Sequence, residues 1–136
     1  MKKLLVVILI AFSIVACETE NIDQPKAEQA VETLINFIKL EEYENVSNLY
    51  TVSLNSGESL EDRTEKLKML RNAMGILKSY ELIEAEQTAE FAEQVKLNLT
   101  YKIKYARVTS IEKFSIIKED GNYKIARHDI KTENFK

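Results

Sequence analysis

The sequence has few of the residues on which metal and redox sites depend. Its 136 residues include one cysteine, one histidine, one proline, three glycines and no tryptophan. A single cysteine and a single histidine exclude a tetrahedral zinc site, a disulfide framework, a CxxC redox pair and a Cys/His catalytic couple. With 45% apolar and 30% charged residues, the composition is that of an ordinary globular protein. The length favours a single domain.

The first residues have the pattern of an export signal. Lys2 and Lys3 form a short basic region, and residues 4–12 are an unbroken apolar run. This run is shorter than the roughly 20 residues that a permanent membrane-spanning helix needs. A polar segment begins abruptly after Cys17. The pattern therefore predicts that residues 1–16 are a cleaved signal peptide rather than the first helix of a folded domain.

The end of this segment, Ile14-Val15-Ala16-Cys17, resembles the lipobox of bacterial lipoproteins. In that family the cysteine thiol receives a diacylglyceryl group as a thioether, and a small residue before it fits the signal peptidase cleft. The resemblance implies that Cys17 becomes the first mature residue and carries fatty acyl chains such as palmitate. More than one chain is needed for stable attachment, since each buried methylene contributes only about 0.8 kcal/mol. We therefore expect a protein that is anchored to a membrane without crossing it.

Residues 17–25 are predicted to be the lipidated cysteine and a polar tether. Glu18, Glu20 and Asp23 resemble the export tag that takes Bacteroidota lipoproteins to the outer face of the outer membrane. A plain solvated linker has the same composition, and in other bacteria a glutamate after the cysteine is compatible with inner-membrane retention. We favour the outer membrane over the inner one.

The remaining residues, 26–136, are predicted to form one α+β domain. Apolar residues first recur at helical spacing, which predicts helices over residues 26–41 and 42–51, a break at 53–57, and a third helix capped at Ser59. The third helix is expected to bury Leu67, Leu70, Met74 and Leu77. The spacing then changes to alternation, which predicts strands over residues 79–89, 95–105, 108–118 and 122–131. Asp120-Gly121 between the last two is a hairpin signal, so the last three strands are expected to form an antiparallel meander.

Two motifs have the apolar and aromatic spacing of the helical opening of NTF2-like (cystatin-like) domains: Ala30-Val31-x-x-Leu34-Ile35-x-Phe37-Ile38 and Glu42-Tyr43-Glu44-Asn45-Val46-x-x-Leu49-Tyr50. The later Leu70-Arg71-x-x-Met74-Gly75-x-Leu77 and Tyr101-x-x-x-Tyr105 are also similar to small exported, functionally unassigned proteins of this family. The resemblance implies a cone of three N-terminal helices packed on a curved four-stranded antiparallel sheet. It does not imply a particular function.

Some members of this family, the ketosteroid isomerases, place an acidic base and hydrogen-bonding acids inside the cone. The resemblance therefore makes catalytic candidates of Glu112, Asp129 and His128, and candidates for a ligand pocket of Tyr101, Tyr105 and Tyr123. Counted along the last strand from Tyr123, His128 has the parity of the solvent face, unless a bulge intervenes. That parity argues against a buried acid/base pair.

The charge pattern points to no metal, cofactor or nucleic acid. Glu58, Glu61, Asp62 and Glu65 share a helical face, but one such face rarely gathers the six to eight oxygens that calcium prefers. The helical half is acidic and the strand half is basic. Lysines such as Lys96 and Lys102 are expected to be the solvated side of the sheet, with docking on an anionic partner as the alternative.

Three hypotheses of function follow. The favoured one is a non-catalytic envelope lipoprotein that binds a small apolar ligand or an envelope protein, in a pocket with no ionised carboxylate at its base. The second is a ketosteroid-isomerase-like enzyme, which requires Glu112 or Asp129 to point into the cavity within reach of a tyrosine. The third is an inhibitor or immunity-type protein with a filled cone.

Overall fold

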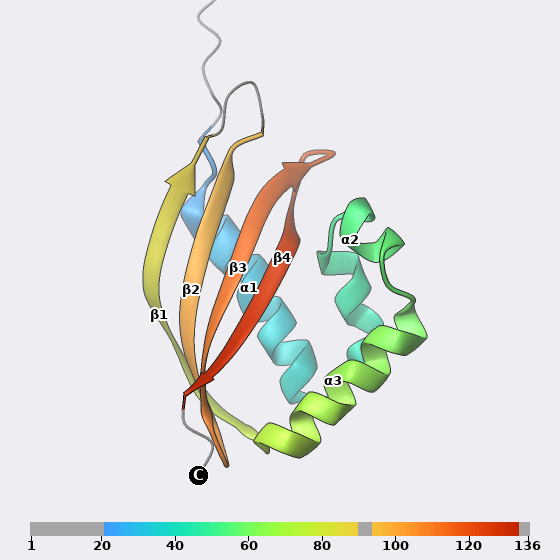
Figure 1. Cartoon of the computed structure of the whole chain (residues 1–136). Coiled ribbons are helices and arrows are strands. Elements are labelled where there is room, and N and C mark those ends of the chain that lie inside the picture. Colours follow the sequence, from blue (N-terminus) through green and yellow to red (C-terminus); the bar gives the residue numbers. More distant parts are fainter. Residues whose placement is uncertain (1–20, 90–93, 134–136) are drawn as a thin grey trace, which may run out of the picture.

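The computed structural model describes residues 21–89 and 94–133 (Figure 1). Its elements are, in order, α1 (Gln24–Lys39), η1 (Tyr43–Leu49), α2 (Val52–Ser56), α3 (Leu60–Met74), β1 (Leu77–Thr88), β2 (Lys96–Tyr105), β3 (Thr109–Glu119) and β4 (Asn122–Glu133). The strands form one antiparallel sheet in the order β1-β2-β3-β4. This arrangement confirms the predicted α+β architecture, with all four strands in the meander. The predicted signal peptide and Cys17 lie outside the described residues.

The long helix α1 lies across one face of the sheet and forms the centre of the core (Figure 1). Asp23 caps its N-terminus by accepting a hydrogen bond from the backbone N–H of Lys26, and Pro25 occupies the first turn. The helix buries Ala27, Val31, Leu34 and Ile35. Each large aliphatic side chain buried in this way contributes about 1.5–3 kcal/mol. Among the described residues, no helix has the length and apolar character needed to cross a membrane.

The helical region and its junction with β1 differ from the prediction in three places. The predicted helix over 42–51 is a 3₁₀ helix, η1. The predicted break at 53–57 contains the short helix α2, because the Thr51 hydroxyl caps it by accepting from the N–H of Leu54. Leu77 belongs to β1 rather than to the third helix, because the chain turns at Gly75, whose φ is +85°. As predicted, the Ser59 hydroxyl caps α3.

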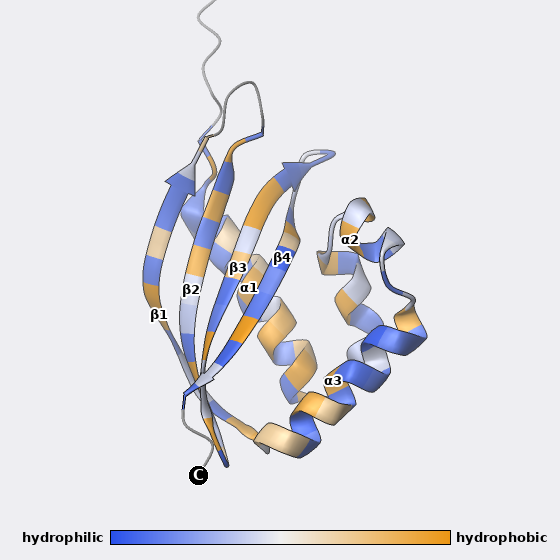
Figure 2. Cartoon of the chain, viewed as in Figure 1, coloured by the Kyte–Doolittle hydropathy of each residue, from blue (hydrophilic) through white to orange (hydrophobic). Residues whose placement is uncertain are grey.

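Apolar and polar residues alternate along the central strands (Figure 2), and the apolar ones are buried on the face that meets the helices. The alternation in β2 buries Leu97, Leu99, Tyr101 and Ile103. Phe114 of β3 meets the Tyr101 ring edge-on, with ring centroids 5.8 Å apart and an interplanar angle of 84°. Such pairs add about 0.5–1.5 kcal/mol to the free energy of area burial.

A β-bulge interrupts the pairing of β3 with β4. Ser115 pairs with Arg127 and Ile116 pairs with Ile125, so Ala126 is left without a partner in the register. The extra residue shifts the alternation of inward and outward side chains by one. His128 is consequently on the inner face, opposite Phe114. At the other end of these strands, Asp120 and Gly121 both have positive φ and make the predicted hairpin turn.

Gly75 and Gly57 provide a matched pair for testing the turn that leads into β1. A Cβ on Gly75 lies 2.9 Å from the Ala106 Cβ, in addition to the strain of its positive φ, whereas Gly57 has ordinary helical φ and only a 3.7 Å contact. We expect Gly75→Ala to lower the free energy of unfolding by about 2 kcal/mol or more, and Gly57→Ala to leave it equal or slightly higher. Urea denaturation checks this, and equal stability of the two variants contradicts it.

Candidate functional site

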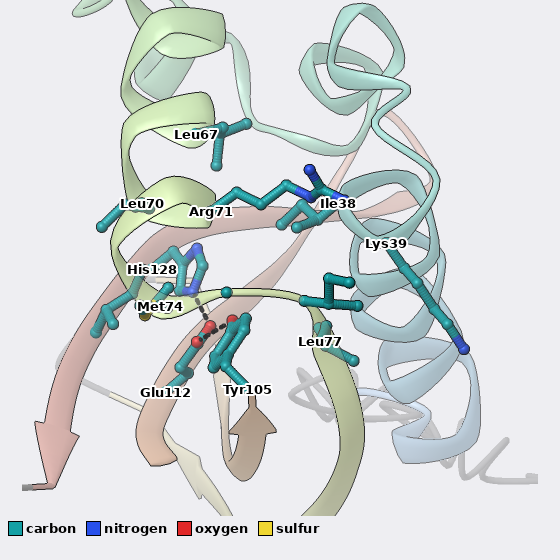
Figure 3. Close-up of a pocket in the computed structure, with 13 residues that line it drawn as sticks. Ile38, Lys39, Leu67, Leu70, Arg71, Met74, Leu77, Tyr105, Glu112 and His128 are labelled. Atoms are coloured by element: carbon teal, nitrogen blue, oxygen red, sulfur yellow. Dashed lines mark hydrogen bonds and ion pairs between the residues drawn. The ribbon is translucent and has the colours of Figure 1, made fainter. Parts of the chain in front are cut away.

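A pocket of about 30 Å³ lies between α3, the end of α1 and the sheet (Figure 3). Its walls are mainly apolar and come from Ile38, Leu67, Leu70, Met74, Ile76, Leu77 and Ile130. Strands β2, β3 and β4 contribute three polar side chains, Tyr105, Glu112 and His128, and the helices add the charged Lys39 and Arg71. A cavity of this size has room for about two water molecules. The pocket therefore has mainly apolar walls and one polar wall.

The polar wall is built around the carboxylate of Glu112, which is 2% exposed. Its Oε1 accepts hydrogen bonds from the Tyr105 hydroxyl and the Ser110 hydroxyl, each 2.7 Å long. Its Oε2 lies 2.7 Å from Nε2 of His128. The four residues come from β2, β3 and β4, and each points inward because of its place in the alternation of its strand.

Burial and hydrogen bonding act on Glu112 in opposite directions. Loss of water raises the pKa of this carboxyl, but the hydrogen bond and charge of His128 and the hydrogen bonds from Tyr105 and Ser110 together lower the pKa below its ordinary value. The group is therefore ionised at neutral pH. An ionised carboxylate only accepts hydrogen bonds, so Nε2 of His128 is the donor. Burial, followed by the charge of Glu112, raises the pKa of Tyr105, which keeps its hydroxyl protonated.

The structure places His128 inside the cone, so the expectation that it faces solvent is wrong. Its side chain is 11% exposed, and its ring stacks on Phe114 with centroids 4.2 Å apart. The cause is the bulge at Ala126, which a count of parity along the strand does not include. One ring nitrogen is held by Glu112 and the other points away from it, toward α3 (Figure 3). Among the described residues, Nδ1 has no hydrogen-bond partner.

The other residues suggested by the sequence lie elsewhere. The side chain of Asp129 is 52% exposed and pairs with Arg127 Nε at 2.8 Å on the outer face. Tyr101 is a core residue whose buried hydroxyl has no partner in the described part of the chain. The Tyr123 hydroxyl accepts from the backbone N–H of Asp23, near the start of α1. Of the three tyrosines, only Tyr105 lines this pocket.

A second pocket of about 110 Å³ adjoins the first along α3. The two share Leu67, Leu70, His128 and Ile130. The second pocket adds Tyr50, Leu54, Glu58, Arg63 and Lys66. Sequence reasoning did not single out Ser110 or Arg63, because a serine in a strand and an arginine in a charged helix are common. The residues that the structure describes contain no group of three side chains able to hold a metal ion.

Comparison with known proteins identifies the fold. No model of a known protein family and no curated protein sequence matches this chain. Solved structures do match. The protein Bd1075 of Bdellovibrio bacteriovorus superposes over 83% of the chain with a TM-score of 0.55 and 13% identity, and the chain spans 41% of its length. A candidate scytalone dehydratase from Novosphingobium aromaticivorans superposes over 82% of the chain and 84% of its own length, with a TM-score of 0.52 and 11% identity.

The fold is the NTF2-like cone. This confirms the fold implied by the apolar and aromatic motifs of the sequence. At identities of 13% and 11%, the likeness concerns the path of the chain only. The chemistry of the site is therefore argued from the side chains of this chain.

Glu112→Gln tests the role of the buried charge. At neutral pH we expect a loss of about 2 kcal/mol in the free energy of unfolding, because an amide cannot accept all the hydrogen bonds that the carboxylate accepts. The folded-state pKa lies below the ordinary 4.5, so the stabilisation is complete above pH 4.5 and is lost as the pH falls below that value. Urea denaturation from pH 7 to pH 3 should therefore show a flatter profile for the variant. Asp129→Asn, on the outer face, is the control, and a profile for Glu112→Gln identical to that of the wild type contradicts the assignment.

Proposed function

We propose that this protein is a lipid-anchored cell-envelope protein whose NTF2-like domain binds a small, mainly apolar molecule that carries a polar group. The observation that supports binding is the composition of the pocket: mainly apolar walls from α1, α3 and β1, with Lys39 and Arg71 among the lining residues, and one wall of hydrogen-bonded Tyr105, Glu112 and His128. The expectation that this pocket has no ionised carboxylate at its base is wrong, because Glu112 lines it. Pockets of this kind hold the body of a ligand by burial and orient it by a few polar contacts.

Entry of a ligand requires α3 to move outward. The helix crosses the open end of the cone (Figure 1), and it buries only Arg63, Leu67 and Met74. Met69 on the same helix is 69% exposed. The start of this helix is fixed by the buried Arg63, which is bonded to η1, α2 and Glu58. Few apolar contacts hold the rest of the helix, so a displacement there that joins the two pockets costs less free energy than a movement of α1.

Lipidation of Cys17 orients the pocket relative to the membrane. Residues 21–23 are already held on the body: the Ile22 side chain is buried, Asn21 Oδ1 accepts from Gln87 Nε2, and the Asp23 N–H donates to Tyr123. Four residue steps from Cys17 to Asn21 reach at most about 14 Å. In Figure 1 this end of the domain is opposite the junction of α3 and β1, where the pocket lies. The pocket thus opens away from the anchoring membrane, and its ligand arrives from the aqueous side.

Cys17→Ser tests the anchor. In cells that process lipoproteins, we expect the wild-type protein to sediment with membranes and to enter the detergent phase of Triton X-114, because two or more acyl chains are attached. The variant should remain in the aqueous phase, whereas Ser13→Ala should behave as the wild type. Sucrose-density fractionation then separates the outer membrane, which we favour, from the inner membrane. Membrane association of Cys17→Ser contradicts lipidation.

A second function, proton transfer on the bound molecule, is favoured by the contact of Glu112 with His128. The enzyme hypothesis requires a carboxylate in the cavity within reach of a tyrosine, and Glu112 meets this condition through Tyr105. Glu112 accepts hydrogen bonds from Tyr105, Ser110 and His128, whereas Nδ1 of His128 points away from this cluster toward α3 (Figure 3). Nδ1 is therefore the group that meets a ligand. The carboxylate fixes the tautomer and stabilises the imidazolium that forms when Nδ1 accepts a proton. A ketone with acidic α-protons suits this arrangement.

2-Tetralone is a probe for both functions, because it has an apolar bicyclic body and one carbonyl beside acidic protons. We expect it to shift the methyl NMR signals of Leu67, Leu70 and Ile130, and His128→Gln to weaken binding by about threefold to tenfold through loss of a hydrogen bond. Faster exchange of the α-protons in D₂O, abolished in His128→Gln and retained in Asp129→Asn, supports catalysis. Binding without exchange supports a non-catalytic binding protein. No shift of the pocket signals contradicts the proposed site.

A further inference from the structure

We infer that the ligand carries a carboxylate, which binds in the second pocket beside Lys66, Arg63 and Tyr50 while the apolar body lies under α3. This inference rests on the proposed function, because it concerns the same cone and the ligand that enters it. It adds a chemical class, an aryl or alkyl carboxylate, that the polar wall around Glu112 does not specify. The evidence for the inference is the balance of hydrogen-bond donors, acceptors and charges in the second pocket.

The second pocket has more hydrogen-bond donors than acceptors. Its donors are the Lys66 ammonium, the Arg63 guanidinium and the Tyr50 hydroxyl, and His128 lies at its border with the first pocket. The only acidic side chain that lines it is Glu58. Both oxygens of Glu58 are already engaged, Oε2 with Arg63 Nε at 3.1 Å and Oε1 with Lys66 Nζ at 3.5 Å. Lys66 and Arg63 thus share the carboxylate of Glu58. The charged side chains that line the pocket therefore carry one net positive charge beside the apolar lining residues.

The guanidinium of Arg63 is fixed in place and is not fully used. Its side chain is 4% exposed, and its Cζ lies 4.5 Å from the centroid of the Tyr50 ring. Apart from Glu58, it donates to the Ser47 hydroxyl, the Asn55 amide oxygen and the Leu54 carbonyl. Within the described part of the chain, these bonds leave one of the five N–H groups of Arg63 without a partner. A buried cation with a spare donor is well suited to a carboxylate oxygen.

Tyr50 and Lys66 complete the set of donors. Burial, opposed by the charge of Arg63, raises the pKa of Tyr50 to about 12, so its hydroxyl remains a donor at neutral pH. No side chain or carbonyl of the described residues accepts from that hydroxyl. Lys66 is 69% exposed and lies at the mouth of the pocket, where it meets an anion that enters from solvent.

The carboxylate of the ligand avoids Glu112 by occupying this pocket. Glu112 lines the first pocket and not the second, and Lys66 and Arg63 line the second and not the first. The border between them is His128 with three apolar side chains, Leu67, Leu70 and Ile130. A ligand that spans this border presents its acid to Lys66, its apolar body to α3 and any second polar group to His128. The reverse orientation places the acid beside the buried Glu112, and of the two cations that line the first pocket, Lys39 and Arg71, the second is already paired with Glu41. Repulsion between two carboxylates therefore disfavours it.

The test compares 2-naphthoate with 2-naphthol, which share the bicyclic body and differ in charge, and adds octanoate to distinguish an aryl from an alkyl acid. Binding is followed by the methyl NMR signals of Leu67 and Leu70.

We expect 2-naphthoate to bind about tenfold more tightly than 2-naphthol, and only the naphthoate affinity to fall as salt is added. Lys66→Gln should weaken naphthoate binding by about threefold to tenfold without changing naphthol binding. Tyr50→Phe keeps the ring beside Arg63 but removes the hydroxyl, and it should also weaken naphthoate binding without changing naphthol binding.

Lys68→Gln, an exposed lysine on the same helix that lines neither pocket, is the control for a general change in charge. Equal affinity for naphthol and naphthoate, or equal effects of Lys66→Gln and Lys68→Gln, overturns the inference and leaves the proposed function intact. If naphthol, naphthoate and octanoate all leave the pocket signals unchanged, both the inference and the proposed function are contradicted. The buried Arg63 is unchanged in the Lys66 and Tyr50 variants, so we expect both to fold. A loss of binding can then be assigned to the missing donor.

Discussion

A carboxylate without access to water is stable inside this sheet only because three strands supply hydrogen-bond donors to it. Removing a lone carboxylate from water costs several kcal/mol even after the protein relaxes. Glu112 of β3 recovers that cost through Tyr105 of β2, Ser110 of its own strand and His128 of β4. The same bonds require these strands to keep their register at the open end of the cone. The polar wall of the pocket and the order of the sheet therefore depend on one buried charge.

The bulge at Ala126 is the backbone feature that makes this arrangement possible. Ile125 packs in the core and His128 contacts Glu112, yet His128 is three positions after Ile125, a spacing that regular alternation places on opposite faces. One extra residue in β4 allows both side chains to point inward. The outward positions of Arg127 and Asp129, which pair with each other, follow from the same shift. Local geometry in one strand thus decides which charged groups meet the pocket.

Much of the fold was predictable from the sequence, because it depends on repeated patterns. Helical spacing in α1, alternation in β2 and the Asp120-Gly121 turn each rest on several residues that agree. The 3₁₀ form of η1 and the short α2 were not predicted, since each depends on one turn of backbone and a single cap at Thr51. Glu112 and Tyr105 were named as candidates from the resemblance to NTF2-like domains. The contact of Glu112 with His128 was not predictable, because a bulge leaves no mark in the pattern of apolar residues.

The two ends of the cone are closed by different means, and this difference bears on function. At the end near Asn21, the incoming chain is held by Gln87 and Tyr123 and by burial of Ile22. At the other end, the C-terminal part of α3 is attached by a few apolar contacts and by polar bonds such as that of Arg71 with Glu41, 2.8 Å long. Partly exposed ion pairs contribute little to stability. The lipid anchor that we propose at Cys17 would act on the firmly closed end. Opening of the pocket beneath α3 would then be mechanically independent of the attachment to the membrane.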